Sequence, residues 1–150
     1  MEDFNTKFGR FAQKHIKKEY FIWLTTVDSA GAPQPRPVWY IWENNSVLVF
    51  SQAKAHKVKH IQNNPKVSLH FNTSDDKGEK RLIVFTGTAS IDNDSPPAHR
   101  IRAYMRKYKT GIKDLNTTPE QFSRTIRSRF EFIPPMYGVG SKILVYNRAG

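Results

Sequence analysis

Two segments of the chain are apolar on both of their alternating faces, and this pattern restricts the fold more than any other feature. Residues 20–27 read Tyr-Phe-Ile-Trp-Leu-Thr-Thr-Val, and residues 35–43 carry aromatic and aliphatic side chains on both sides. Residues of these types favour strands. A strand that is apolar on both faces is buried on both faces, so these segments exclude a single sheet with one side in water.

Further extended segments complete the predicted sheet. Asn44 and Asn45 separate residues 35–43 from residues 47–50 and predict a tight antiparallel hairpin, because asparagine tolerates a positive φ. Three prolines at every second position predict that the entry to this hairpin is extended and lies at a sheet edge. These prolines are Pro33, Pro35 and Pro37. The other predicted strands are residues 67–71, residues 82–91 with a bulge or bend at Gly87, residues 129–133 and residues 142–146.

Apolar residues at helical spacing predict helices between and after these strands. The predicted helices cover residues 4–18, residues 54–63, a segment that opens at Ser95-Pro96-Pro97, and a segment that starts at Thr118-Pro119 with a capping box to Gln121. The elements together predict a mainly β, α+β fold in one domain of residues 1–150. We expect an antiparallel barrel, closed or nearly closed, flanked by short helices.

Composition excludes several classes of chemistry. The chain has no cysteine, so it has no disulfide, no thiolate nucleophile and no sulfur-ligated zinc. Its net charge of +11 favours anionic partners such as phosphorylated small molecules, nucleic acids or anionic membranes. No apolar segment is long enough to span a membrane, and the first ten residues are polar. We therefore expect a cytoplasmic protein that is not bound to a membrane.

The segment of residues 50–65 carries the strongest chemical signal. A strand end at Ser51 is followed by His56 and Lys57 at the start of a predicted helix. Free backbone N–H groups, a hydroxyl and cationic side chains at a helix N-terminus can bind a phosphate. The alternative is a solvated basic face on a surface helix, and the pattern by itself favours neither.

Two further kinds of site receive less support. His56 and His60 have a spacing that can hold a metal, but no third ligand is nearby and the lysines on the same helix would repel a cation. We therefore predict no metal site. No serine lies in a nucleophile elbow, so no serine hydrolase triad is predicted, and no catalytic residue is assigned.

The hairpin brings an apolar strand toward the predicted phosphate site. Residues 38–40 lie on the strand whose partner ends at Phe50 and Ser51, directly before the basic helix start. A planar ring could rest against this strand while its phosphate reaches His56 and Lys57. This hypothesis rests on proximity through the hairpin.

Several segments together resemble the pyridoxamine 5'-phosphate oxidase-like, FMN-binding split-barrel proteins. The segments that carry the resemblance are residues 31–40, Phe50-Ser51, residues 55–69 and residues 84–89. Tyr108, Ile112 and residues 118–122 are similar to the branch of deazaflavin-dependent enzymes, which use coenzyme F420. The resemblance spans nearly the whole chain. It implies a homodimer of six-stranded split barrels, with one flavin or deazaflavin in each of two clefts at the interface.

The resemblance also implies which residues contact the cofactor. The strand Arg36, Pro37, Val38, Trp39 and Tyr40 would lie along the ring, and Phe50, Ser51, His56 and Lys57 would surround the phosphate. Ala55 and His56 stand where the oxidase has serine and arginine, which alters the phosphate site. The C-terminal arginine and histidine with which the oxidase holds its substrate have no counterpart between Arg129 and Gly150. The resemblance therefore does not extend to the oxidase's own substrate.

These expectations lead to a flavin-dependent oxidoreductase that transfers hydride to or from an unidentified small molecule. A basic cleft would favour an anionic substrate, but the basic residues could equally lie on the outer surface. FMN is the first choice of cofactor and coenzyme F420 the alternative. A competing hypothesis is a non-catalytic anion-binding or nucleic-acid-binding protein, based on the basic clusters at residues 14–18, 100–109 and 124–129. Nucleic acid is not the expected partner, because no recognised nucleic-acid motif is present. A flavin-storage or sensing protein without turnover is a third hypothesis.

Overall fold

The computed structural model describes residues 7–44, 46–72, 74–76, 79–92, 94–126, 128–132 and 142–147. Four α-helices, one 3-10 helix and nine strands lie within these residues. In chain order they are α1 (Lys7–Lys18), β1 (Phe21–Val27), β2 (Pro33–Trp39), β3 (Ile41–Glu43), β4 (Ser46–Ser51), α2 (His56–Asn63), β5 (Lys66–His70), β6 (Ser74–Asp76), β7 (Glu79–Ile91), η1 (Ala98–Arg100), α3 (Arg102–Asp114), α4 (Pro119–Thr125), β8 (Ser128–Phe132) and β9 (Lys142–Asn147).

The strands form one curled antiparallel sheet in the order β2-β1-β5-β7-β8-β4-β3, with β6 and β9 also paired to β7. The two ends of this path, β2 and β3, are separated in the chain by Tyr40 alone. The mainly β, antiparallel prediction is therefore confirmed. The described residues hold nine strands, whereas the resemblance implied six. Compared with the seven extended segments predicted from the sequence, residues 35–43 are divided in two and residues 74–76 form an additional short strand. The pairing is an open path, so the sheet curls without a closing ladder among the described strands.

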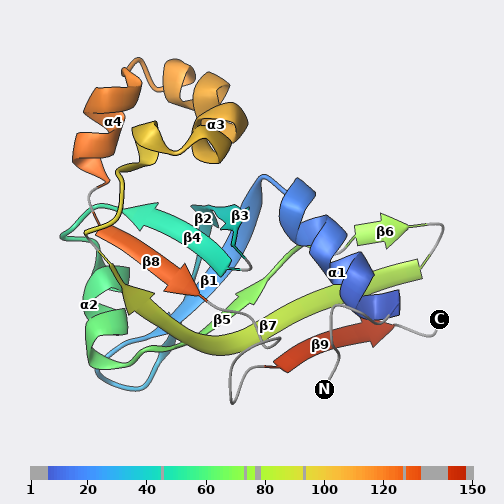
Figure 1. Ribbon diagram of the computed structural model, residues 1–150. Coiled ribbons are helices and arrows are strands. Elements are labelled where there is room, and N and C mark those ends of the chain that lie inside the picture. Colours follow the sequence, from blue (N-terminus) through green and yellow to red (C-terminus); the bar gives the residue numbers. More distant parts are fainter. Residues whose placement is uncertain are drawn as a thin grey trace.

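Strand β7 joins the two halves of the sheet. It pairs with β9 and β5 over its first part and with β8 over residues 89–91, and Figure 1 shows it curving along its length. Its pairing with β5 runs through Gly87 with an unbroken register, so the bulge predicted there is absent from this ladder. The curvature is instead distributed along the strand.

Burial on both faces occurs in β4, whose six residues are all buried. The prediction of such burial is wrong for β1, in which Ile22, Leu24 and Thr26 are buried and the residues between them are half-buried or exposed, and for β2, which is largely exposed. Val47 and Val49 belong to a core with residues of α1, β1, β5, β7 and α2, whereas Leu48 and Phe50 belong to a second core with η1 and α3. The sheet therefore separates two apolar cores. Helices α3 and α4 lie together on one side in Figure 1, and α1 lies across the other half of the molecule.

The helix predictions agree with the structure at most of their boundaries. Helix α4 begins after Thr118, whose hydroxyl accepts the Gln121 N–H at 3.2 Å while the Gln121 side chain accepts the Thr118 N–H at 3.2 Å. The predicted capping box is thus confirmed. The helix predicted from Ser95-Pro96-Pro97 is a short 3-10 turn followed by α3. Phe4 lies outside the described residues. None of the helices in the described segments is long and apolar enough to cross a membrane.

The division between β2 and β3 is produced by Tyr108 of α3. Its buried hydroxyl accepts the Tyr40 N–H at 2.7 Å and lies 2.6 Å from the Tyr40 carbonyl oxygen and 2.8 Å from the Tyr20 carbonyl oxygen. This phenol oxygen therefore occupies the place where the ladder between β1 and β2 would continue. The sequence pattern could not show this interruption, because the interacting residues are 68 positions apart.

Strand β2 is the edge that the three prolines predicted. Within the described residues it pairs with β1 alone, from Phe21 opposite Trp39 to Val27 opposite Pro33. Because proline has no N–H, the bonds to β1 run through the alternate residues, and the proline carbonyl groups face outward. The carbonyl oxygen of Pro35 accordingly accepts a hydrogen bond from the Arg36 guanidinium at 2.7 Å. The outer edge of β2 therefore offers acceptors and, at the proline positions, no donors.

Candidate functional site

A pocket of about 550 Å³ lies between the edge strand β2 and the start of α2. This volume falls within the range of roughly 300–1,000 Å³ that is usual for small-molecule sites. The residues that line it come from β1, the turn after β1, β2 and α2. They are Thr26, Asp28, Gln34, Arg36, Pro37, Ala55, His56, Lys57 and His60.

Two cations meet in this pocket. The Lys57 side chain is half-buried, and its Nζ lies 3.4 Å from the hydroxyl oxygen of Ser51. Burial lowers the pKa of Lys57, and the positive charge of Arg36 lowers it further. Two like charges held together at a partly desolvated position favour an anion between them. The electrostatics of this pair would therefore suit an anion.

The N-terminus of α2 points to the same chemistry. Ala55, the residue before the helix, gives no side-chain cap, so no side chain of the cap satisfies the first N–H groups of the helix. These groups and the helix dipole favour a negative charge at His56 and Lys57. Ammonium, guanidinium, hydroxyl and free helix N–H groups together form a donor set that fits a phosphate.

The opposite side of the pocket carries a fixed carboxylate. Asp28 accepts the backbone N–H groups of Ala30 at 3.0 Å and Ala32 at 2.9 Å, and the Gln34 amide at 2.9 Å. These hydrogen bonds, from Ala32 first and then from Gln34, lower the pKa of Asp28. Gly31 has a φ of 80° and completes the tight turn that holds this carboxylate. The pocket thus has a cationic end and an anionic end.

His60 and Thr26 lie between these ends. The Thr26 hydroxyl and the His60 Nδ1 are 2.8 Å apart, and Thr26 is buried. The His56 and His60 rings lie 6.3 Å apart between their centroids. Among the described residues, no three histidine, aspartate or glutamate side chains come together as a metal site. The His60 ring is instead oriented by a hydroxyl of the neighbouring strand.

The structure places only some of the predicted cofactor residues at the pocket. Arg36, Pro37, His56 and Lys57 line it, and Ser51 reaches it through Lys57. The others point elsewhere: Val38 and Tyr40 are buried in the first core, Phe50 is buried in the second core, and Trp39 packs against the second core and stacks on Tyr108 with ring centroids 4.6 Å apart. The side chains of residues 38–40 therefore pack mainly into the two cores, with Trp39 half-buried. Within the described residues the outer backbone edge of β2 is unpaired.

Sequence reasoning missed four polar or charged residues of the pocket: Thr26, Asp28, Gln34 and His60. Asp28 lies in the turn after β1 and carries no functional prediction from the sequence, and His60 is considered there only together with His56 as a metal pair. Their role depends on the antiparallel pairing of β1 and β2, which sets Gln34 opposite Thr26. The local signal for Asp28 is its position directly before Ser-Ala-Gly, because an aspartate there commonly accepts hydrogen bonds from the backbone of the turn.

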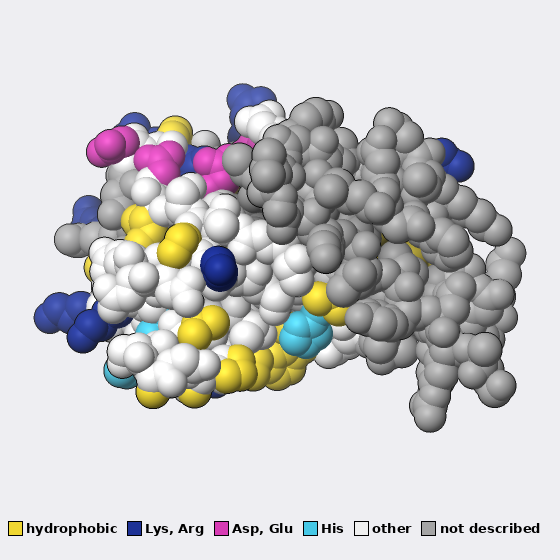
Figure 2. All heavy atoms as spheres, turned by 90° about the horizontal axis from the view of Figure 1, so that it is seen from below, with side chains coloured by type: hydrophobic (Ala, Val, Ile, Leu, Met, Phe, Trp, Pro, Cys, Tyr) yellow, Lys and Arg dark blue, Asp and Glu magenta, His cyan; other side chains and the backbone are white. Residues whose placement is uncertain are grey.

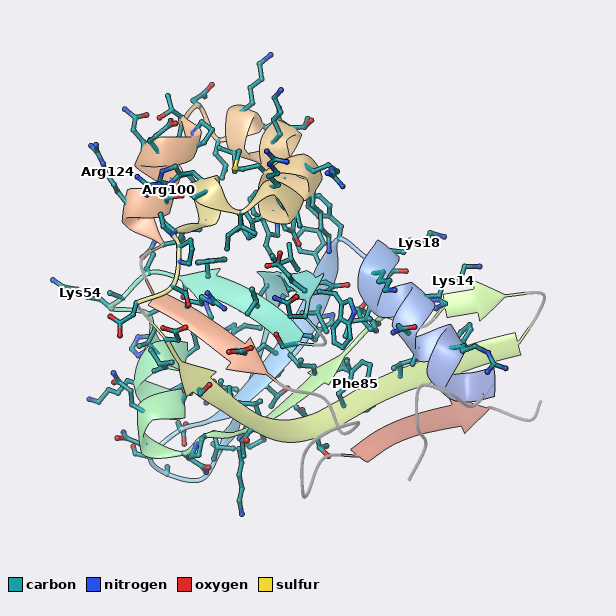
Figure 3. All side chains as sticks on the ribbon, viewed as in Figure 1. Lys14, Lys18, Lys54, Phe85, Arg100 and Arg124 are labelled. Carbon is teal, nitrogen blue, oxygen red and sulfur yellow. The ribbon has the colours of Figure 1, made fainter. Side chains whose placement is uncertain are left out.

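The basic side chains of the molecule do not form one face. In Figure 3, Lys14 and Lys18 extend from α1 on one side, whereas Lys54, Arg100 and Arg124 lie on the opposite side. Seen from below in Figure 2, acidic side chains form a group apart from the lysine, arginine and histidine side chains at the left edge. The basic side chains labelled in Figure 3 are thus divided between two sides of the molecule. The number of basic residues therefore does not by itself indicate a continuous basic groove for a nucleic acid.

Comparison with known proteins agrees with this fold. Residues 10–129 match the family described as pyridoxamine 5'-phosphate oxidase. The chain is 30% identical over 132 residues to the pyridoxine/pyridoxamine 5'-phosphate oxidase of Blochmanniella floridana, covering 80% of this chain. It spans 60% of the length of that relative.

Solved structures with the same fold differ in what their names state. A conserved hypothetical protein from Mycobacterium tuberculosis superposes with a TM-score of 0.72 at 18% identity, covering 98% of this chain and 88% of that one. An F420 reductase superposes with a TM-score of 0.63 at 18% identity, covering 87% of this chain and 94% of that one. The haem storage protein HutZ from Vibrio cholerae superposes with a TM-score of 0.58 at 15% identity, covering 92% of this chain and 95% of that one. At these identities the structures share the fold alone, and it is the family match over residues 10–129 that places the chain: it belongs to the pyridoxamine 5'-phosphate oxidase family.

Proposed function

We propose that the protein is a flavin-dependent oxidoreductase that binds FMN in the pocket between β2 and α2. The observation that carries the proposal is the pair of Arg36 and Lys57, two cations that meet in a half-buried pocket beside the Ser51 hydroxyl. Such a pair is suited to the phosphate of a cofactor. Family membership supports a flavin as the group that carries this phosphate.

The residues of the pocket have distinct tasks in this proposal. Lys57 and Arg36 neutralise the phosphate, Ser51 offers its hydroxyl, and the first N–H groups of α2 complete the anion site. The outward carbonyl groups of β2 accept hydrogen bonds from N–H groups at the edge of a planar ring. When bound, the flavin supplies the hydride transfer, and the protein supplies binding and orientation. A second copy of the chain would complete the cleft.

Coenzyme F420 is the alternative cofactor for the same pocket. The F420 reductase among the structural neighbours favours it, and the phosphate site suits either cofactor. Reduced FMN reacts with oxygen, whereas the reduced deazaflavin does not do so readily. Reoxidation of the bound, reduced cofactor in air therefore separates the two. The haem storage protein with this fold favours a third candidate, a carrier without turnover.

Absorption titrations of the purified protein with FMN, with F420 and with riboflavin test the proposal. Riboflavin carries the same ring without the phosphate. We expect Lys57→Gln to weaken FMN binding about ten- to hundredfold, because a charged hydrogen bond to phosphate contributes about 1.5–3 kcal/mol. Riboflavin binding should change little. Lys59→Gln is the matched control, since Lys59 is exposed on the same helix and does not line the pocket.

Each outcome of these titrations decides a different part of the proposal. Tight binding of F420 without binding of FMN would move the reaction to deazaflavin chemistry. An equal loss of FMN affinity in Lys57→Gln and Lys59→Gln would remove the phosphate role of Lys57. If the native protein binds neither cofactor at micromolar concentration, the assignment as a flavin or deazaflavin protein fails.

A further inference from the structure

A second, smaller pocket of about 240 Å³ lies between α1, β3 and α3. It shares no residue with the pocket at β2 and α2. Four of its seven lining side chains are cationic: Lys17 and Lys18 from the end of α1, and Arg106 and Lys107 from α3. Ile41, Trp42 and Ala103 form its apolar wall. Figure 3 shows Lys18 at the end of α1, on the side where α1 approaches α3.

Lys107 is fixed at this pocket by contacts within the protein. Its Nζ lies 3.7 Å from the centre of the Tyr40 ring and donates to the Tyr40 carbonyl oxygen at 3.1 Å. An ammonium group has three N–H donors, so one hydrogen bond leaves two for another acceptor. Burial lowers the pKa of Lys107 to about 8, and Glu19 opposes this shift. The ammonium group of Lys107 is thus held in place, and part of its hydrogen-bonding capacity remains for a ligand.

Helix electrostatics explains only half of this cluster. Lys17 and Lys18 lie in the last turn of α1, where cations stabilise the helix dipole. Arg106 and Lys107 lie in the interior of α3 and have no such benefit. Within the described part of the chain, none of the four forms an ion pair. Four like charges around one small pocket repel one another, and a bound anion would relieve this repulsion.

We propose that this pocket binds a small molecule that carries a phosphate group. Lys17, Arg106 and Lys107 hold the phosphate, and Ile41 and Trp42 contact the apolar part of the molecule. A phosphate dianion matches four cations better than a single carboxylate does. The volume is below the roughly 300–1,000 Å³ of drug-sized sites, which fits a phosphate with few atoms attached.

Chemical-shift titration of the ¹⁵N-labelled protein tests this site directly. The probes are phenyl phosphate, inorganic phosphate and acetate, and the Lys57→Gln variant is used so that the first pocket does not compete. We expect saturable shifts at the amides of Ala103 and Arg106, with phenyl phosphate binding more tightly than inorganic phosphate and acetate binding most weakly. The shifts are read at this pocket alone, so the test does not depend on the cofactor assignment.

Two double variants separate a site from a merely basic surface. Lys17→Gln with Arg106→Gln should weaken phenyl phosphate binding at least about tenfold. Lys66→Gln with Lys109→Gln removes the same charge from two exposed residues outside both pockets and should change it less than about twofold. Equal losses in the two pairs, or shifts that do not saturate, would overturn the proposal. The proposal would also be overturned if a short single-stranded oligonucleotide bound more tightly than phenyl phosphate and its binding weakened equally in the two double variants.

The pH dependence provides a second readout for Lys107. The charged and titratable groups around it are Lys17, Lys18, Arg106, Glu19, and the phenols of Tyr40 and Tyr108. Burial raises the pKa of both phenols, so they stay protonated near neutral pH. Lys107 is then the group that changes, and binding should weaken between about pH 7.5 and 9.5. Unchanged affinity over this range would exclude Lys107 from the site.

Discussion

Lys57 and Lys107 are both half-buried lysines, and their surroundings differ in an informative way. Burial lowers the pKa of each. The protein meets the charge of Lys107 with a carbonyl oxygen at 3.1 Å and the face of the Tyr40 ring. It meets the charge of Lys57 only with a hydroxyl at 3.4 Å and places Arg36 beside it. Lys107 therefore has two close contacts within the protein, whereas Lys57 has one longer contact and a second cation beside it.

This contrast predicts that the corner around Tyr108 and Lys107 determines stability. The largest effect is expected for Tyr108→Phe, because it leaves the buried Tyr40 N–H without its acceptor. We expect a loss of about 1–3 kcal/mol in the free energy of unfolding, measured by urea denaturation. Tyr104→Phe is the matched control, since Tyr104 is equally buried and no hydrogen bond of its hydroxyl occurs among the described residues. Equal losses in both variants would contradict the role of the Tyr108 hydroxyl.

Gly111→Ala probes how tightly the same corner is packed. An added Cβ would lie 2.5 Å from the Tyr20 hydroxyl oxygen and 2.9 Å from the Trp39 ring. Overpacking costs about 1–3 kcal/mol, and the better helix propensity of alanine offsets roughly 1 kcal/mol of it. We expect a net loss near 1 kcal/mol in urea unfolding. Thr110→Ala, at an exposed neighbouring position, should not destabilise the protein. If Gly111→Ala were as stable as the native chain, the side chains of Tyr20 and Trp39 could move to accommodate the added Cβ.

The lowered pKa of Lys107 predicts a defined change of stability with pH. The pKa is about 8 in the folded protein against 10.5 for an unperturbed lysine, so between these values the unfolded chain binds more protons. The contribution of Lys107 to stability therefore rises with pH across this window, and the cost of burying its charge is complete below about pH 8. Relative to Lys107→Met, the native protein should gain stability from pH 8 to pH 10.5 in urea unfolding. Lys109→Met, at an exposed position, should show no such trend against the native chain.

The smallest effect on stability is expected in the candidate cofactor pocket. Lys57→Gln removes a charge that burial and Arg36 both disfavour, so stability should change by less than about 0.5 kcal/mol, in the direction of an increase. The same variant is expected to lose most of its affinity for FMN. Thermal unfolding without cofactor measures the change in stability, with Lys59→Gln as the control. A large destabilisation would mean that the contact of Lys57 with Ser51 contributes to the fold.

Much of the architecture could be predicted from the sequence because its signals are local. Proline at alternate positions fixed β2 as an edge, Thr118 with Gln121 marked the start of α4, and the Asn44 turn, with its φ of 51°, joins β3 to β4 as a hairpin. Burial on both faces could not be assigned reliably from apolar residues alone, because it occurs in β4 but not in β1 or β2. The interruption at Tyr40 could not be predicted, because it depends on a hydroxyl from a helix far along the chain.

The candidate site was predicted only in part, for the same reason. His56 and Lys57 lie at a helix start, which a sequence pattern can identify. Asp28 and Gln34 reach the pocket only because a turn and an antiparallel ladder bring them there. The apolar strand of residues 38–40 was interpreted as a surface for a ring, but the structure uses its side chains in the two cores. In a strand that is apolar on both faces, the sequence does not show which side chains enter a core and which line a pocket.

The three outward prolines of β2 also bear on how this protein behaves in concentrated solution. An exposed strand edge normally recruits strands from other molecules, and fibrils grow through such contacts. A strand added beside β2 would find carbonyl oxygens but no N–H groups at Pro33, Pro35 and Pro37, and could form only half of its ladder there. The edge thus remains open to a small molecule that donates N–H groups, while a strand from another molecule gains only part of the usual backbone hydrogen bonds there.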